Sequence, residues 1–113
     1  MKMITAIVQP DRLEDVIYAA VGAGARGLTA TEVHGFGQQY GHLGAGAGSA
    51  ERMALVLPKL RIDIVVADET ADSMVGAIAK SVHTGSIGDG KIWVSPVESV
   101  VRVRTGQRDR EAV

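Results

Sequence analysis

The sequence of 113 residues predicts an α+β fold, a ferredoxin-like βαββαβ sandwich with a long loop between its second and third strands. Three observations support this fold class. Apolar runs typical of strands alternate with two amphipathic segments at helical spacing. They follow the order strand, helix, strand, strand, helix, strand, and a Gly-, Ala- and Ser-rich segment without periodicity interrupts the series. The length is that of one domain, so we expect residues 1–113 to fold as a single unit.

The first half of the chain predicts two strands and a helix. Residues 3–8 (MITAIV) are apolar with little alternation, as in a strand buried on both faces. Pro10 suits the first position of a helix, and Gly22 and Gly24 are typical of its end. Residues 28–36, which are rich in Thr and Val, predict the second strand. The helix is predicted from an apolar stripe of Leu13, Val16, Ile17, Ala20 and Val21.

The second half repeats this order after a loop. Residues 38–55 predict a flexible, functional loop because they are rich in Gly and follow no period. Residues 60–66 alternate as a strand does, and Asp68 is expected to cap the helix that follows. The remaining expected elements are a helical stripe of Ala71, Met74, Val75, Ile78, Ala79 and Val82, a strand over 91–94, a short C-terminal strand over 100–104 and a solvated tail over 107–113.

Two helices can cover only one face of such a sheet. The first and third strands nevertheless carry apolar residues on both faces. The uncovered face therefore needs a partner, and we expect a symmetric homo-oligomer to supply it.

Composition excludes several classes of function. The 12 Lys and Arg nearly balance the 13 Asp and Glu, so no overall field favours nucleic acid or an anionic membrane. The absence of Cys excludes disulfides and thiolate chemistry. The apolar opening residues are too few for a secretory signal or a membrane span, which predicts a cytoplasmic protein. The three His have no metal-ligand spacing, and no acid–base pair or triad can be assigned, so we expect a protein that is not an enzyme.

Two glycine-rich segments imitate nucleotide motifs. Residues 22–27 fit G-x-G-x-x-G, but a helix precedes them and a strand follows, which indicates an ordinary turn. Residues 85–91 fit G-x-x-x-x-G-K, yet a strand follows and Ile92 stands where magnesium binding needs Ser or Thr. Three glycines beside Lys91 still suit a phosphate, the alternative being a simple helix-to-strand turn.

The other cations favour the phosphate interpretation. Lys59 and Arg61 are two residues apart and share one face of a strand, as do Arg102 and Arg104. Either pair alone is typical of a solvated sheet edge. Three cationic clusters in a nearly neutral chain indicate a local site for a polyanion such as a nucleoside di- or triphosphate.

Four separate motifs carry a resemblance to a known family. They are GFGQQ at 35–39, LPK at 57–59, TGSIGDGK at 84–91 and RVRTG at 102–106. In this order they closely resemble the PII nitrogen-regulatory signal transducers. The resemblance implies a homotrimer of ferredoxin-like subunits that binds ATP or ADP in the clefts between subunits. It also implies a T-loop over 38–55 that docks on a target protein such as a membrane transporter, a B-loop over 84–91 and a C-loop over 102–109.

The resemblance also implies site residues. In the family, magnesium-ATP recruits 2-oxoglutarate. The resemblance therefore implies that Gln39 is the metal ligand. It also implies a 2-oxoglutarate site made of Gln39, Gly41, Lys59 and Gly88. Arg102 and Arg104 are expected to reach the phosphates from the neighbouring subunit. The full set of implied nucleotide-binding residues is Ile7, Thr29, Gly35, Phe36, Gly37, Gln38, Gln39, Asp63, Val65, Thr84, Gly85, Ile87, Gly88, Asp89, Gly90, Lys91, Arg102 and Arg104.

The sequence departs from the family pattern at three positions. Gln38 replaces an Arg and Ser86 replaces a Lys, which implies weaker nucleotide binding or a shift toward ADP or AMP. Arg52 stands where the family carries the Tyr that is covalently modified, so we expect no such modification. Three functions stay open: a nitrogen-regulating sensor, a PII-like paralogue that serves bicarbonate or metal transport without 2-oxoglutarate, and a slow ATPase.

Overall fold

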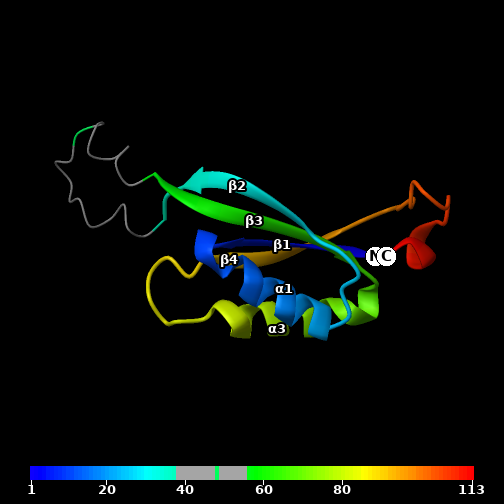
Figure 1. The fold of residues 1–113 in the computed structure, drawn as a ribbon, viewed down its shortest axis with the longest axis horizontal. Helices are drawn as coiled ribbons and strands as arrows, with labels where there is room; N and C mark the ends of the chain where they lie inside the picture. The colour runs from blue at the N-terminus through cyan, green and yellow to red at the C-terminus, as the bar shows by residue number, and fades with distance from the viewer. Residues whose placement is uncertain (38–47, 49–55) are drawn as a thin grey trace.

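The computed structural model describes residues 1–37, 48 and 56–113. Four antiparallel strands form one sheet in the order β2-β3-β1-β4, and two helices lie together on one side of it (Figure 1). This arrangement confirms the ferredoxin-like α+β fold. The elements are β1 (Lys2–Val8), α1 (Leu13–Gly22), β2 (Thr29–Gly35), β3 (Leu57–Val66), α3 (Ala71–Val82) and β4 (Lys91–Pro96), with short 3-10 helices η1 (Pro10–Arg12), η3 (Asp68–Thr70) and η4 (Asp109–Ala112).

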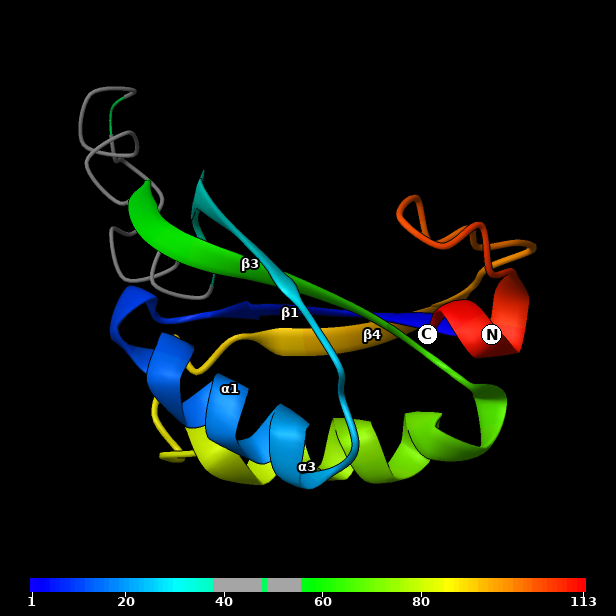
Figure 2. The ribbon, with the colours of Figure 1, turned by 45° about the vertical axis from the view of Figure 1, so that its right-hand side comes forward.

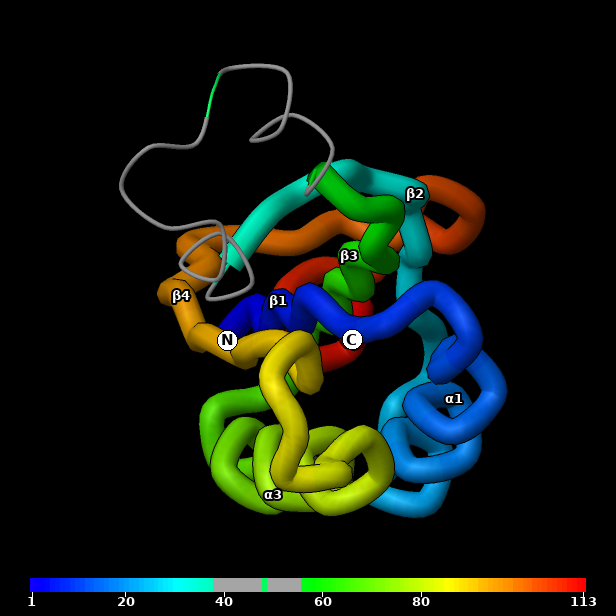
Figure 3. The backbone as a smooth tube through the Cα atoms, turned by 90° about the vertical axis from the view of Figure 1, so that its left-hand side faces the viewer, coloured from blue at the N-terminus to red at the C-terminus, as the bar shows by residue number. Residues whose placement is uncertain are grey.

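The core lies between the sheet and the two helices (Figures 2 and 3). Strand residues alternate between the two faces, so every second side chain of β1 and β3 points at the helices. Buried Val16 and Ala20 of α1 and Met74 and Ile78 of α3 meet them there. The strand residues of this core are Ile4, Ala6, Val8, Leu60, Ile62, Ile64 and Val66.

The opposite surface of the sheet, here called the open face, carries Ile7, Lys59, Arg61, Lys91 and Trp93. Ile7 of β1 pairs with Arg61 on one side and with Lys91 on the other. No helix in the described ranges 1–37 and 56–113 covers this face (Figure 3). The register therefore gathers cations from two strands around one apolar side chain.

Three of the four strands are longer than the sequence predicts, whereas β2 is shorter. β3 begins at Leu57 and not at residue 60, although Pro58 lacks a backbone N–H. Pro58 pairs only with His34 of β2, because the pairing of β1 with β3 ends at Leu60. β3 is thus an edge strand at this point, and an edge tolerates proline.

The apolar stripe of α1 is only partly buried. Val16 and Ala20 are fully buried, whereas Ile17 and Val21 are 38 % and 61 % exposed. These two residues of the stripe stay outside the core, since they lie beyond the arc of the helix that the sheet covers.

The predicted cap of the second helix is also wrong. Asp68 begins η3 and pairs with the amino group of Met1 at 2.8 Å, while α3 starts three residues later without a side-chain cap. This ion pair holds the pKa of Asp68 below its usual value. The carboxylate thus joins the start of β1 to the segment that follows β3.

The C-terminal residues pair mainly with one another. The expected strand over 100–104 reduces to a single bridge between Val101 and Arg108. A tight turn closes this hairpin, since Arg102 donates to Gln107 and accepts from Gly106, which has a φ of 72°.

Residues 107–111 are exposed, as the sequence suggested for a solvated tail, but the segment is folded. η4 folds back so that Arg110 pairs with Glu69, and the Arg102 guanidinium donates to the Ala112 carbonyl at 3.3 Å. None of the helices in the described part of the chain has the length and hydropathy of a membrane span.

The entry into β4 allows a test of the fold. A Cβ at Gly90 would lie 1.8 Å from the Ile7 carbonyl oxygen, and the φ of 101° disfavours any side chain. We expect Gly90→Ala to lower the free energy of unfolding by about 2–4 kcal/mol, because backbone must shift against backbone. The urea-unfolding midpoint, followed by circular dichroism, measures this loss.

Gly76→Ala is the matched control. Gly76 lies exposed in α3 with open space around its Cα, so alanine should raise the free energy of unfolding by about 0.5–1 kcal/mol. Equal stability of Gly90→Ala and the natural protein would show that the turn does not depend on this contact.

Candidate functional site

The turn between α3 and β4 has an unusual backbone. Gly85, Gly88 and Gly90 have φ values of 86°, 103° and 101°, in the region that glycine adopts without strain. The Gln9 side chain at the end of β1 donates to the Gly88 carbonyl at 2.8 Å. The turn is therefore held at the same end of the sheet at which β1 ends.

Asp89 organises this turn from within. Its carboxylate accepts the backbone N–H of Thr84 at 2.8 Å, that of Gly85 at 2.9 Å and the Thr84 hydroxyl. The hydrogen bonds from Thr84, followed by that from Gly85, lower the pKa of Asp89 to about 2. His83 lies 3.8 Å from the same carboxylate.

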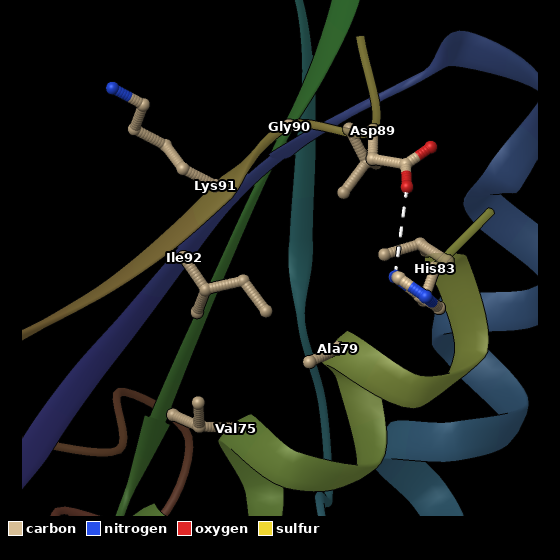
Figure 4. Close-up of a pocket in the computed structure, with 9 residues that line it drawn as sticks. Val75, Ala79, His83, Asp89, Gly90, Lys91 and Ile92 are labelled. Atoms are coloured by element: carbon tan, nitrogen blue, oxygen red, sulfur yellow. Dashed lines mark ion pairs between the residues drawn. The ribbon is translucent and has the colours of Figure 1, made fainter. Parts of the chain in front are cut away.

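The turn has two distinct sides (Figure 4). The Asp89 carboxylate points toward His83, next to an apolar pocket of about 260 Å³ between α3 and β4 that includes Val75 and Ile92. The Lys91 side chain points the other way, away from Val75 and Ile92. The anion and the cation of this segment are thus directed to opposite sides.

The Lys91 side of the turn borders a groove of about 680 Å³. Glycine backbone, Ser86, Asp89 and two lysines provide its polar part, and half-exposed apolar side chains provide the rest. Such a combination suits a ligand with an anionic and an apolar part. The lining residues are Ile7, Gly35, Phe36, Gly37, Lys59, Ser86, Ile87, Gly88, Asp89, Gly90, Lys91 and Trp93.

The cations of the open face differ in their partners. Arg61 donates to Asp63 at 3.0 Å, and Thr5 donates to the same carboxylate at 2.7 Å. Burial opposes the charge of Asp63, but these hydrogen bonds outweigh it and lower the pKa. Lys59 is only 9 % exposed and has no carboxylate partner among the described residues. A nearly buried ammonium without a counter-ion is costly, so Lys59 favours an anionic ligand.

One subunit gathers only part of the predicted nucleotide site. Nine of the predicted nucleotide-binding residues line the groove: Ile7, Gly35, Phe36, Gly37, Ile87, Gly88, Asp89, Gly90 and Lys91. Lys59, which was predicted for 2-oxoglutarate, lines it as well. Thr84 and Gly85 belong to the turn without lining the groove.

The remaining predicted residues lie elsewhere. Thr29 pairs with Asp63 farther along the sheet, and Val65 follows two residues later. The hairpin that carries Arg102 and Arg104 lies at the far end of the molecule from the turn (Figure 1). Gln38, Gln39 and Gly41, and with them the implied magnesium ligand and most of the T-loop, lie outside the described residues.

Sequence reasoning missed Trp93 as a groove residue. It is 41 % exposed and lies two residues after Lys91 on the same strand, so both share the open face. The alternation of β4 carried this signal once Lys91 had been placed at the site.

The low pKa of Asp89 predicts a pH dependence. A carboxylate with a lowered pKa in the folded state contributes stability above its unfolded value of 3.8, and this contribution is lost as the pH falls toward 2. The stability difference between the natural protein and Asp89→Asn should therefore be constant above about pH 5 and shrink between pH 5 and 2. Chemical unfolding of ligand-free protein at several pH values measures it.

Glu98→Gln is the control, because exposed Glu98 has no hydrogen bond or ion pair within the described ranges. Its stability difference from the natural protein should stay near zero above pH 5. A pH-independent difference for Asp89→Asn would contradict the role given to this carboxylate.

The comparisons with known proteins agree with this geometry. Residues 1–107 match the family described as nitrogen regulatory protein P-II. The chain is 45 % identical to the nitrogen regulatory protein GlnK of Escherichia coli K12 and 48 % identical to the nitrogen regulatory protein P-II of Microchaete diplosiphon, in both cases over the whole of both chains. It is 50 % identical to nitrogen regulatory protein P-II 2 of Methanothermobacter thermautotrophicus, over all of this chain and 97 % of the relative. Fold, turn and sequence together place this chain in the PII family of nitrogen-regulatory signal-transduction proteins.

Proposed function

We propose that this chain is a cytoplasmic PII-type regulator that binds ATP or ADP in the groove beside the turn 84–91. It acts on nitrogen metabolism or transport by docking the loop 38–55 on a target protein. The observation that supports this most directly is the groove itself, where the nearly buried Lys59 and the exposed Lys91 lie beside a glycine-rich backbone turn.

The phosphates lie at the polar end of this groove. Lys91 supplies a point charge, and the positive φ values of Gly88 and Gly90 allow backbone to approach an anion closely. Phe36, Ile87 and Trp93 provide apolar surface for the purine and ribose. Gln39 would contribute an amide oxygen to a magnesium ion, which would offset the phosphate charge.

A neighbouring subunit completes the site. The hairpin that carries Arg102 and Arg104 lies at the opposite end of the sheet from the turn 84–91 of its own subunit (Figure 2). In a homotrimer the hairpin of the next subunit brings them to the phosphates. The Nε atom of Arg102 is buried without a hydrogen-bond partner in the described structure.

Lys59 is proposed to bind a carboxylate of 2-oxoglutarate, next to Gly88, Gln39 and Gly41. Asp63 and Asp89 already accept hydrogen bonds from structural partners, so neither is available as a general base. This supports a binding protein over an ATPase.

Calorimetric titration tests the function. ATP, ADP and AMP are each titrated with and without magnesium and 2-oxoglutarate. Binding of ATP that 2-oxoglutarate strengthens supports a nitrogen sensor. Binding without this enhancement favours the paralogue that serves bicarbonate or metal transport, and no binding of any adenine nucleotide overturns the proposal.

Lys91→Ala should weaken ATP binding roughly 10- to 100-fold, since a hydrogen bond to a charged group contributes about 1.5–3 kcal/mol. Lys80→Ala is the matched control, because Lys80 is an exposed lysine of α3 that does not line the groove. Unchanged ATP affinity in Lys91→Ala would show that the phosphates do not bind beside Lys91. The fluorescence of Trp93, the single tryptophan, gives an independent readout.

Lys59→Met should raise the free energy of unfolding of the ligand-free protein by about 1 kcal/mol, because it removes a nearly buried cation without a described partner. The same change should abolish any effect of 2-oxoglutarate on ATP binding. Lys80→Met should leave stability within about 0.5 kcal/mol of the natural value. A destabilised Lys59→Met that still responds to 2-oxoglutarate would show that Lys59 has a structural partner instead.

A further inference from the structure

Helix α1 has a second apolar face that the fold does not use. Ile17, Tyr18 and Val21 are 38 %, 79 % and 61 % exposed, and Glu14 is exposed beside them. Positions 14, 17, 18 and 21 follow the spacing i, i+3, i+4, i+7, which puts them on one continuous strip of helix. We call these four residues the outer face of α1.

The neighbouring helix shows that this layer does not require apolar residues. The exposed positions of α3 include Asp72, Ser73, Gly76 and Lys80, which are polar or small. Both helices lie on the same side of the sheet, and the outer surface of each faces away from it (Figure 3). An apolar strip on only one of them is typical of a surface that a partner covers.

The spacing and charge of the strip indicate the partner. A strip with i, i+3, i+4, i+7 spacing packs most closely against another helix. Arg12 is paired with Asp15 at 3.2 Å, whereas Glu14 has no ion-pair partner among the described residues. The strip therefore combines apolar surface with one free carboxylate, which favours a partner helix that carries Lys or Arg beside its own apolar residues.

A second copy of this chain fits the strip less well. In a dimer that pairs two such strips, Glu14 of one copy would find no Lys or Arg in the strip of the other copy. Three side chains also bury far less than the roughly 1,200 Å² that a stable dimer interface requires. The expected contact is weak, and it gains strength when several subunits of one oligomer engage a partner together.

We propose that the outer face of α1 is a docking surface for a basic amphipathic helix of a target protein, separate from the nucleotide groove and from the loop 38–55. It lies on the helix side of the sheet, opposite the open face, so copies that cover the open face leave it accessible (Figure 1). This surface does not depend on nucleotide binding.

The test uses a synthetic 14-residue helical peptide with leucines at i, i+3, i+4, i+7 spacing flanked by lysines, and a scrambled peptide of the same composition. Binding to the full-length protein is followed by backbone amide chemical shifts. The ordered peptide should shift the resonances of residues 14–22, and the scrambled peptide should not. Tyr18→Ser with Val21→Ser should weaken binding roughly tenfold, and Glu14→Gln about threefold.

Lys80→Ser is the control on α3 and should leave peptide affinity unchanged. Shifts centred on other residues, equal binding of both peptides, or unchanged affinity in the Tyr18 and Val21 variant would overturn the proposal. Self-association at high concentration that the same variant abolishes would also overturn it, in favour of a second copy as the occupant. ATP titration of the variant should remain normal, which separates this surface from the nucleotide groove.

Discussion

The close approach of Gly90 to the Ile7 carbonyl is the contact on which the rest of the site depends. It allows the chain to leave the turn and enter β4 directly against β1, in the register that pairs Lys91 with Ile7. Because Ile7 also pairs with Arg61, this one register determines which cations share the open face. Any side chain at position 90 would force the two backbones apart and would displace Lys91 from the groove.

Pairing within the sheet then decides which of these cations can meet a ligand. Asp63 accepts hydrogen bonds from Thr5 and Arg61, so the charge of Arg61 is balanced inside the subunit. Lys59, one pleat away, lacks such a partner in the described ranges although it is more deeply buried. A formal net charge of -1 for the chain says nothing of this local excess, because it averages paired and unpaired groups.

The sequence predicted those features that depend on neighbours in the chain. Alternation predicted the strands, helical spacing predicted both helices, and the glycines with Lys91 predicted the turn beside the groove. The prediction from sequence failed where contacts between distant parts of the chain determine the structure. A stripe wide enough to include Ile17 and Val21 does not reveal how much of the helix the sheet covers. Asp68 pairs with the amino group of Met1 and does not cap α3. The pairing of Thr29 with Asp63 likewise depends on long-range register that no local pattern encodes.

An acidic residue in a turn proposed to bind phosphate is at first unexpected, but its hydrogen bonds resolve the difficulty. Asp89 takes the backbone N–H groups of Thr84 and Gly85 and faces His83, so its charge is used on the helix side of the turn. Those two N–H groups shape the turn and are not free for a phosphate, which leaves the N–H groups of Ile87 and Gly88 as donors without a backbone acceptor in the described structure. A turn that keeps its shape before a ligand arrives does not lose ordering entropy on binding. The same carboxylate that would repel a phosphate at short range therefore favours its binding, because it holds the backbone in place from the opposite side.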